Sequence, residues 1–234
     1  MRERQGMNMK AEAELTPREK KRALRTMEIV AAAEAVFLEK GYERASVSEV
    51  AARVGVVEGN VFRYFPTKRD LLNSVLRSLY EPLIADVEHG FSRIADLHGR
   101  VRFIVWRHIR VYTETPGLAR LVLHEIRTAP DYRTSALYDL QLRYTDFLRK
   151  TLEQAVMDGE LKAPVNFPHA RAMLYGGLEH LMWPVLSGDR VVEVDRVADE
   201  YTTAYLHGVG APSSSVEQRL DRIERLLAAR GANT

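Results

Sequence analysis

The chain has 234 residues, of which 46% are hydrophobic and 28% are charged, and its formal net charge is +2. This composition is typical of a globular protein with one large domain or two smaller ones. The absence of cysteine excludes disulfide bonds, thiolate metal sites and cysteine catalysis, and because no apolar run approaches the roughly 18 residues that span a bilayer, we expect a cytoplasmic protein with no membrane partner.

The N-terminal part of the chain divides into an arm and a helix. Residues 1–15 are polar and without periodicity, and we predict that they form a disordered arm. Thr16, Pro17 and Glu19 then supply an N-cap, a proline at the first helical position and an acidic residue in the first turn. The helix is predicted to continue to about Lys40. Its buried face is expected to contain Ile29, Ala32, Ala33, Val36 and Phe37.

Residues 46–72 contain two short helical patterns joined by a glycine. Apolar residues recur at i, i+3, i+4 and i+7 over residues 47–54, and Gly55 then breaks the pattern. A second helix is predicted over residues 58–65, and Pro66 ends it because the residue before a proline is pushed out of the α conformation. Two short helices around a glycine turn form a helix-turn-helix, whose second helix enters a DNA major groove.

In this region the chain resembles the TetR/AcrR family of transcriptional regulators. The resemblance is carried by Ile29, Ala33, Val36, Phe37, Gly41, Tyr42, Ser46, Val50, Ala51, Gly55, Val56, Gly59, Val61, Phe62, Tyr64, Phe65, Lys68, Leu71 and Leu72. Two positions depart from the family pattern. Val57 stands where the family commonly has a serine that caps the recognition helix, and Phe62 stands where it commonly has a tyrosine that touches phosphate. The first change weakens the cap and the second removes a hydroxyl donor.

The exposed residues of the second helix are candidates for reading DNA bases. Arg63 can donate two hydrogen bonds to guanine, Asn60 can pair with adenine, and Glu58 can accept from cytosine or disfavour wrong sites. The resemblance implies further contacts to phosphate. The predicted DNA-binding set is therefore Ser46, Glu58, Gly59, Asn60, Arg63, Tyr64, Thr67 and Lys68. Each of these could instead be a solvated surface residue.

A basic cluster precedes the helix-turn-helix. Residues 1–75 hold 14 Lys and Arg against 11 Asp and Glu, and Lys20, Lys21, Arg22 and Arg25 lie close together among them. Such a cluster could neutralise phosphates or reach a minor groove. A solvated face would explain so small an excess equally well.

The remainder of the chain is helical by pattern. The predicted domains are a helix-turn-helix domain over 16–66, a helical effector-binding and dimerisation domain over 67–211, and a linker with an amphipathic helix over 212–234. Within the second domain, helices are predicted at about 67–89, 100–115, 118–128, up to 158, 169–187 and 191–207, with breaks at Pro116-Gly117 and Gly159. The C-terminal helix could pack on its own body or pair across a dimer, and we favour the body. The fold class is all-α.

The resemblance also implies a homodimer, a palindromic double-stranded DNA operator and a small-molecule effector. The candidate effector-binding residues are the aromatic and histidine side chains Trp106, His108, Tyr112, His124, Tyr144, Tyr175, His180 and Trp183. Aromatic residues at helical spacing more often belong to a core. Arg102, Arg107, Arg110 and Arg127 would suit an anionic effector such as an acyl-coenzyme A, although surface solvation explains them equally well.

Enzyme signals are poor, and no catalytic residue, metal site or cofactor is predicted. His124 and Glu125 begin like a zinc-protease motif, but the second histidine is missing. The leading hypothesis is a DNA-binding regulator, in particular a repressor released by a small hydrophobic or amphipathic effector. The alternative is a helical small-molecule-binding protein whose DNA-binding unit is vestigial, which Val57, Phe62 and Glu58 would favour.

Overall fold

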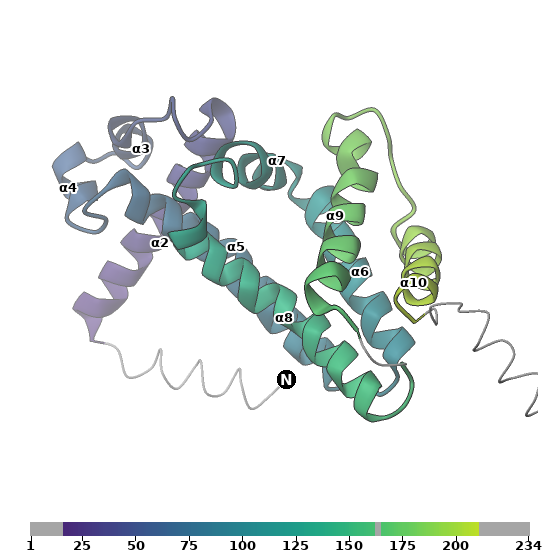
Figure 1. The fold of residues 1–234 in the computed structure, drawn as a ribbon. Coiled ribbons are helices and arrows are strands. Elements are labelled where there is room, and N and C mark those ends of the chain that lie inside the picture. Colours follow the sequence, from purple (N-terminus) through teal and green to yellow (C-terminus); the bar gives the residue numbers. More distant parts are fainter. Residues whose placement is uncertain (1–15, 162–164, 211–234) are drawn as a thin grey trace, which may run out of the picture. The chain divides into compact units, whose positions relative to one another are not determined.

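A computed structural model describes residues 16–161 and 165–210, and every regular element within those ranges is a helix (Figure 1). The predicted arm and the C-terminal amphipathic helix lie outside the described residues. In chain order the elements are α2 (Pro17–Lys40), α3 (Val47–Arg53), α4 (Glu58–Phe62), α5 (Lys68–Phe91), α6 (Leu97–Glu114), α7 (Pro116–Arg120), the π-helix η1 (Leu121–Ile126), the 3-10 helix η2 (Tyr132–Thr134), α8 (Ala136–Met157), α9 (Phe167–Leu186) and α10 (Val194–Gly210).

The described residues form two compact units. The first takes its residues from Met1–Asp86 and Thr115–Tyr144, and the second from Val87–Glu114 and Thr145–Thr234. Helices α5 and α8 therefore contribute to both. This structural division differs from the predicted functional domains, because the central segment 115–144 packs with the N-terminal helices.

The first unit is organised by the buried face of α2. Ile29, Ala32, Ala33, Val36 and Phe37 are all buried, as predicted. Helices α2 and α3 both begin in a capping box, in which the N-cap hydroxyl and a glutamate three residues later satisfy each other's backbone N–H groups. Ion pairs between Lys40 and Glu49, and between Arg53 and Glu39, also connect the two helices. The pKa of Glu49 is lowered to about 2, first by the hydrogen bond from Lys40 and then by the backbone of Ser46.

The helix-turn-helix forms where the sequence predicts it, although α4 is shorter than expected. Gly55 has a φ of 68°, which permits the tight turn between α3 and α4. Helix α4 ends at Phe62 rather than Phe65, and the backbone N–H groups of Tyr64 and Phe65 both bond to the Val61 carbonyl. Val61 and Phe65 are buried and fix this segment against the core.

The central segment differs most from expectation. The predicted break at Pro116-Gly117 is present, because α6 ends at Glu114 and Thr115 has a non-helical backbone. Pro116 then occupies the first turn of α7, where its missing N–H is tolerated. The expected helix over 118–128 is instead split into the end of α7 and the π-helix η1. Gly117 allows α7 to approach α2, since a Cβ there would lie 3.0 Å from Cδ2 of Leu38.

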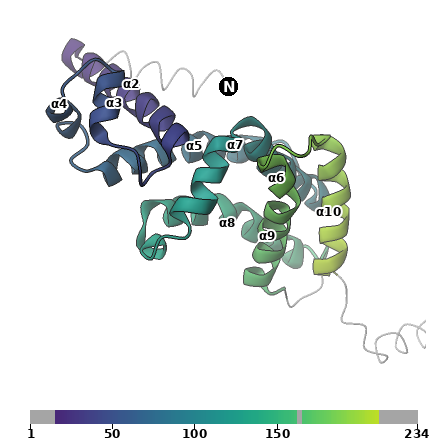
Figure 2. The ribbon, with the colours of Figure 1, turned by 90° about the horizontal axis from the view of Figure 1, so that it is seen from above.

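The second unit packs α6, α9 and α10 together (Figures 1 and 2). The hydroxyl of Tyr201 on α10 donates to the Met173 and Leu174 carbonyls of α9 at 2.8 and 3.0 Å. Gly177 makes room for this ring, because a Cβ at that position would overlap the Tyr201 hydroxyl. Gly177 therefore serves the packing of α9 on α10 within one chain.

Within the described residues, no helix is both long enough and apolar enough to cross a membrane.

Gly177→Ala is expected to lower the free energy of unfolding by about 1–3 kcal/mol, because the new methyl group overpacks the α9–α10 contact. Urea unfolding at fixed protein concentration measures this loss. The loss should be smaller in a Tyr201→Phe background, where the overlapping hydroxyl is gone. Equal losses in both backgrounds would show that Tyr201 is not the residue that requires glycine.

Candidate nucleic-acid interface

Helix α4 presents its polar residues outward. Glu58, Gly59, Asn60 and Arg63 are exposed, whereas Val61 is fully buried. Val61 is the buried residue of this five-residue helix, so the polar residues are left on its accessible side. The residues predicted to contact bases therefore share one accessible surface, as direct readout requires.

Two hydroxyl residues predicted to contact phosphate also cap helices. The Ser46 hydroxyl accepts from the Glu49 backbone N–H at 3.2 Å, which leaves its own proton for donation. The Thr67 hydroxyl instead donates to the Asp70 carboxylate at 2.7 Å and accepts from the Asp70 N–H at 3.0 Å. A phosphate contact by Thr67 would have to displace a carboxylate, whereas one by Ser46 would not. Both contacts remain predictions.

Lys68 is held near the turn that follows α2. Its ammonium group donates to the Glu43 carbonyl at 3.1 Å and lies 4.5 Å from the centre of the Tyr42 ring. An ammonium has three donors, so this position is compatible with a phosphate contact. The Tyr42 ring in turn packs against Phe37, with centroids 5.5 Å apart.

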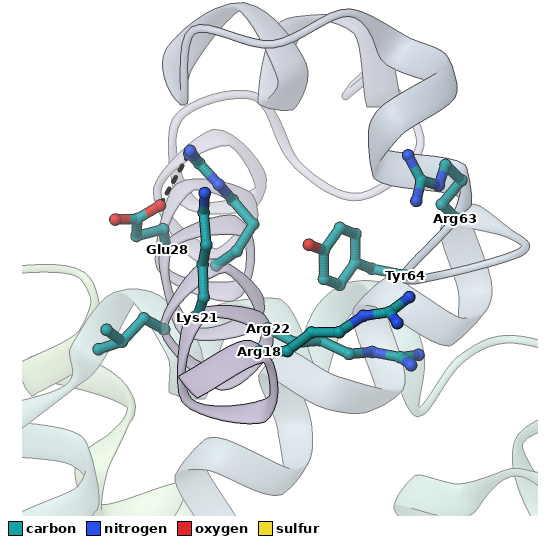
Figure 3. Close-up of a pocket in the computed structure, with 8 residues that line it drawn as sticks. Arg18, Lys21, Arg22, Glu28, Arg63 and Tyr64 are labelled. Carbon is teal, nitrogen blue, oxygen red and sulfur yellow. Dashed lines mark ion pairs between the residues drawn. The ribbon is translucent and has the colours of Figure 1, made fainter. Parts of the chain in front are cut away.

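A basic groove lies between the N-terminal half of α2 and the end of α4 (Figure 3). It has a volume of about 470 Å³ and is lined by Arg18, Lys21, Arg22, Leu24, Arg25, Glu28, Arg63 and Tyr64. Arg18 and Arg22 extend from α2 toward Tyr64 and Arg63, and the Arg22 guanidinium lies 5.9 Å from the centre of the Tyr64 ring. The sequence pattern indicated a basic cluster of Lys20, Lys21, Arg22 and Arg25, of which Lys20 does not line the groove. It missed Arg18, whose spacing of three and four residues from Lys21 and Arg22 was the available signal.

Three of the predicted effector-binding residues lie together in the second unit. The His108 ring meets the Tyr112 ring at 5.4 Å and the Tyr175 ring at 4.9 Å, both edge to face. Tyr112 is buried, and burial raises the pKa of the Tyr175 hydroxyl. This cluster joins α6 to α9, and His108 and Tyr175 are half-buried.

The other five candidates lie elsewhere. Trp106 stacks on Phe103 and carries the Arg110 guanidinium 4.5 Å from its ring centre, while Tyr144 packs edge to face with Tyr80. His124 lines a second hollow, of about 300 Å³, beside the C-terminal end of α2. His180 and Trp183 lie on the exposed side of α9. The eight residues thus do not form a single cluster, because two of these five pack against other rings, one lines a hollow and two face outward.

Two family models match the chain. One, described as bacterial regulatory proteins of the tetR family, matches residues 29–75, and the other, described as the tetracyclin repressor-like C-terminal domain, matches residues 95–209. The chain belongs to the TetR family. Members are DNA-binding transcriptional regulators, so this protein is a regulator and not an enzyme.

Individual relatives are distant but cover most of the chain. The fatty acid metabolism regulator protein of Bacillus subtilis (strain 168) is 22% identical over 183 residues, which cover 78% of this chain and 94% of that protein. The HTH-type transcriptional repressor KstR2 of Rhodococcus jostii (strain RHA1) is 20% identical over 192 residues, covering 80% and 92%. The crystal structure of the regulator FadR from Bacillus subtilis with stearoyl-CoA covers 78% of this chain and 98% of its own, with a TM-score of 0.71 and 22% identity.

This TetR-family regulator has an unusual start to its recognition helix. Val57 holds the N-cap position with an extended backbone, makes no side-chain cap, and is 70% exposed. Phe62, at the other end of α4, is 39% exposed. An exposed phenyl ring cannot donate to phosphate, but it can contact the methyl group of thymine.

Val57→Ser is expected to raise the free energy of unfolding by about 0.5–2 kcal/mol, because a serine hydroxyl can accept from the uncapped N–H groups of α4. Thermal or urea unfolding measures the change. Val57→Ala is the matched control, since it removes the same exposed side chain without adding an acceptor. A serine variant no more stable than the alanine variant would contradict the missing cap.

Proposed function

We propose that this protein is a repressor that binds a palindromic operator as a homodimer and releases it when a long-chain acyl-coenzyme A binds. The observation that carries the proposal is the exposure of Glu58 and Asn60 on α4, and of Arg63 at its C-cap, around the buried Val61. Arg63 is proposed to bond guanine and Asn60 adenine. Because chromosomal DNA is the target, the proposed compartment is the cytoplasm.

Gly59 supports close contact between α4 and DNA. It is exposed, and a Cβ built there would meet no atom of the chain within 4 Å. The fold itself therefore does not require a glycine at this position. A glycine is required where a second molecule approaches the backbone closely, as a DNA strand beside a recognition helix would.

The exposed side of α9 is the proposed dimer surface. Met173, Gly176, His180 and Trp183 recur at helical spacing, and Met173 and Trp183 are 50% and 48% exposed. Large apolar side chains on one exposed stripe favour a partner surface, and Gly176, with no atom within 4 Å of its Cβ position, leaves room for one. Pairing of two such faces would present two recognition helices to half-sites about 34 to 36 Å apart.

The effector class comes from the relatives. The FadR structure contains stearoyl-CoA, and a molecule of that kind joins a long apolar chain to a charged head. The cluster of His108, Tyr112 and Tyr175 is proposed as a wall of the effector site, because it brings an imidazole and two phenol groups together between α6 and α9. Trp106, His124, Tyr144, His180 and Trp183 remain weaker candidates for effector contact.

Coupling between effector and DNA is proposed to use the central segment 115–144. Within the first unit, Asp131 accepts from Arg69 at 2.6 Å and Arg143 donates to Glu81 at 2.8 Å. These contacts join the segment to α5, which begins directly after the helix-turn-helix. An effector that favours one position of this segment would shift the population of DNA-binding conformations by its differential affinity.

Wild-type protein is expected to bind a promoter fragment from its own gene neighbourhood selectively, and Arg63→Ala is expected to weaken that binding by about 1–3 kcal/mol. Titration of labelled duplexes against scrambled duplexes measures both. Arg93→Ala, which removes an exposed arginine of the second unit, should leave the affinity unchanged. Folded protein with no preference for any neighbourhood fragment would favour the vestigial alternative.

Stearoyl-CoA is expected to release the operator fragment, whereas coenzyme A alone is not, because the acyl chain supplies the apolar contact. Competition titrations with the bound duplex measure release. His108→Ala should reduce the response to stearoyl-CoA and leave the affinity for DNA intact. If the same concentration of stearoyl-CoA releases the duplex from wild type and from His108→Ala, the aromatic cluster is not part of the effector site.

A further inference from the structure

The N-terminal half of α2 extends beyond the core of the first unit. None of residues 17–28 is buried, and the first buried residue of the helix is Ile29. An exposed segment of about twelve residues is only marginally stable as a helix in water. The capping box of Thr16 and Glu19 stabilises its first turn. No buried contact explains why the helix extends over residues 17–28.

This half-helix concentrates positive charge on one face. Arg18, Lys21, Arg22 and Arg25 recur at i, i+3, i+4 and i+7, and all four line the groove. Arg25 is neutralised by Glu28 at 2.8 Å, and the Glu19 carboxylate is engaged by Thr16. Across residues 16–161 and 165–210, no carboxylate forms an ion pair with the remaining three cations or with Arg63.

Such an arrangement costs stability unless an anion is present. Like charges three and four residues apart on a helix repel each other, and here Arg63 adds a fourth unneutralised cation from the opposite wall (Figure 3). Guanidinium groups are planar donors that match phosphate oxygens. The Tyr64 ring lies against the Arg22 guanidinium at 5.9 Å and brings a hydroxyl donor to the same groove.

We infer that this groove holds a backbone phosphate of bound duplex DNA, so that Arg18, Lys21 and Arg22 form a second, sequence-independent part of the interface. The inference rests on the proposed function. Arg63 and Tyr64 directly follow α4 and also line the groove. A duplex contacted by α4 therefore places its backbone phosphates close to the groove. The same chemistry would accept a phosphate group of a free anion, which the experiment must separate from DNA.

The test is the salt dependence of DNA binding by the full chain, measured for the operator fragment and for a scrambled duplex. Arg18→Gln/Arg22→Gln removes two groove cations. Arg93→Gln/Arg190→Gln is the matched control, since it removes two exposed arginines of the second unit that do not line the groove. Each lost phosphate contact reduces the magnitude of the slope of log K against log salt by roughly 0.9. A bound homodimer has two grooves with one phosphate each, so the groove variant should lose about 1.8. Its preference for operator over scrambled duplex should stay constant.

Each outcome decides the inference. A slope reduced in the groove variant alone supports it, even if wild type shows no sequence preference and the proposed function fails. Equal slopes in both variants, with selective binding by wild type, overturn the groove and leave the proposed function standing. Absence of DNA binding at every salt concentration overturns both.

A second arm separates DNA from free anions. Thermal unfolding is measured with inorganic pyrophosphate at constant ionic strength. If pyrophosphate stabilises wild type but not the groove variant, and the two DNA slopes are equal, the groove is a site for a free phosphate compound and the DNA assignment is wrong. The expected result is the reduced slope, with or without stabilisation by pyrophosphate, because a groove that binds a DNA phosphate also accepts a free one.

Discussion

A helix of seven residues and a helix of five residues cannot hold their positions unaided, because each forms too few backbone hydrogen bonds to offset the ordering of its ends. The placement of α3 and α4 therefore depends on the apolar face of α2. Val50 and Val61 are fully buried, and Phe65 closes the segment after α4. Everything that the recognition helix offers to DNA is oriented by these few contacts, which explains why so small a unit can present Asn60 and Arg63 in a fixed direction.

The sequence predicted most helix boundaries because they are marked by local chemistry. Thr16 and Ser46 form capping boxes with the acid three residues on, and Gly55 and Gly159 adopt the positive φ that ends or turns a segment. Where no local rule applied, the prediction failed. The π-helix Leu121–Ile126, which replaces part of the helix expected over 118–128, has no distinctive residue pattern. Its extra residue per turn is set by tertiary packing, which a single sequence does not reveal.

The candidate DNA-binding residues were easier to predict than the effector-binding ones, for a physical reason. Polar residues on a short amphipathic helix have only one direction available, namely away from the buried Val61. Aromatic residues fit equally well inside a core, in a cavity or on a partner surface. On α9 the buried positions are taken by Leu174, Leu178 and Met182, so Trp183 is turned outward, and the pattern alone did not say which stripe of this largely apolar helix would be buried.

The ion pairs between the central segment 115–144 and α5 are suited to a conformational switch because each contributes little free energy. Asp131 and Arg143 lie in ion pairs whose side chains are 33–61% exposed, and pairs of this kind contribute about 0–1 kcal/mol each. Allosteric coupling free energies are typically about 1–3 kcal/mol, so an effector could rearrange both pairs with its differential affinity alone. The buried residues of α2 and α3 are far more costly to disturb. Effector binding would then move the DNA-binding helices as one body and leave their internal packing intact.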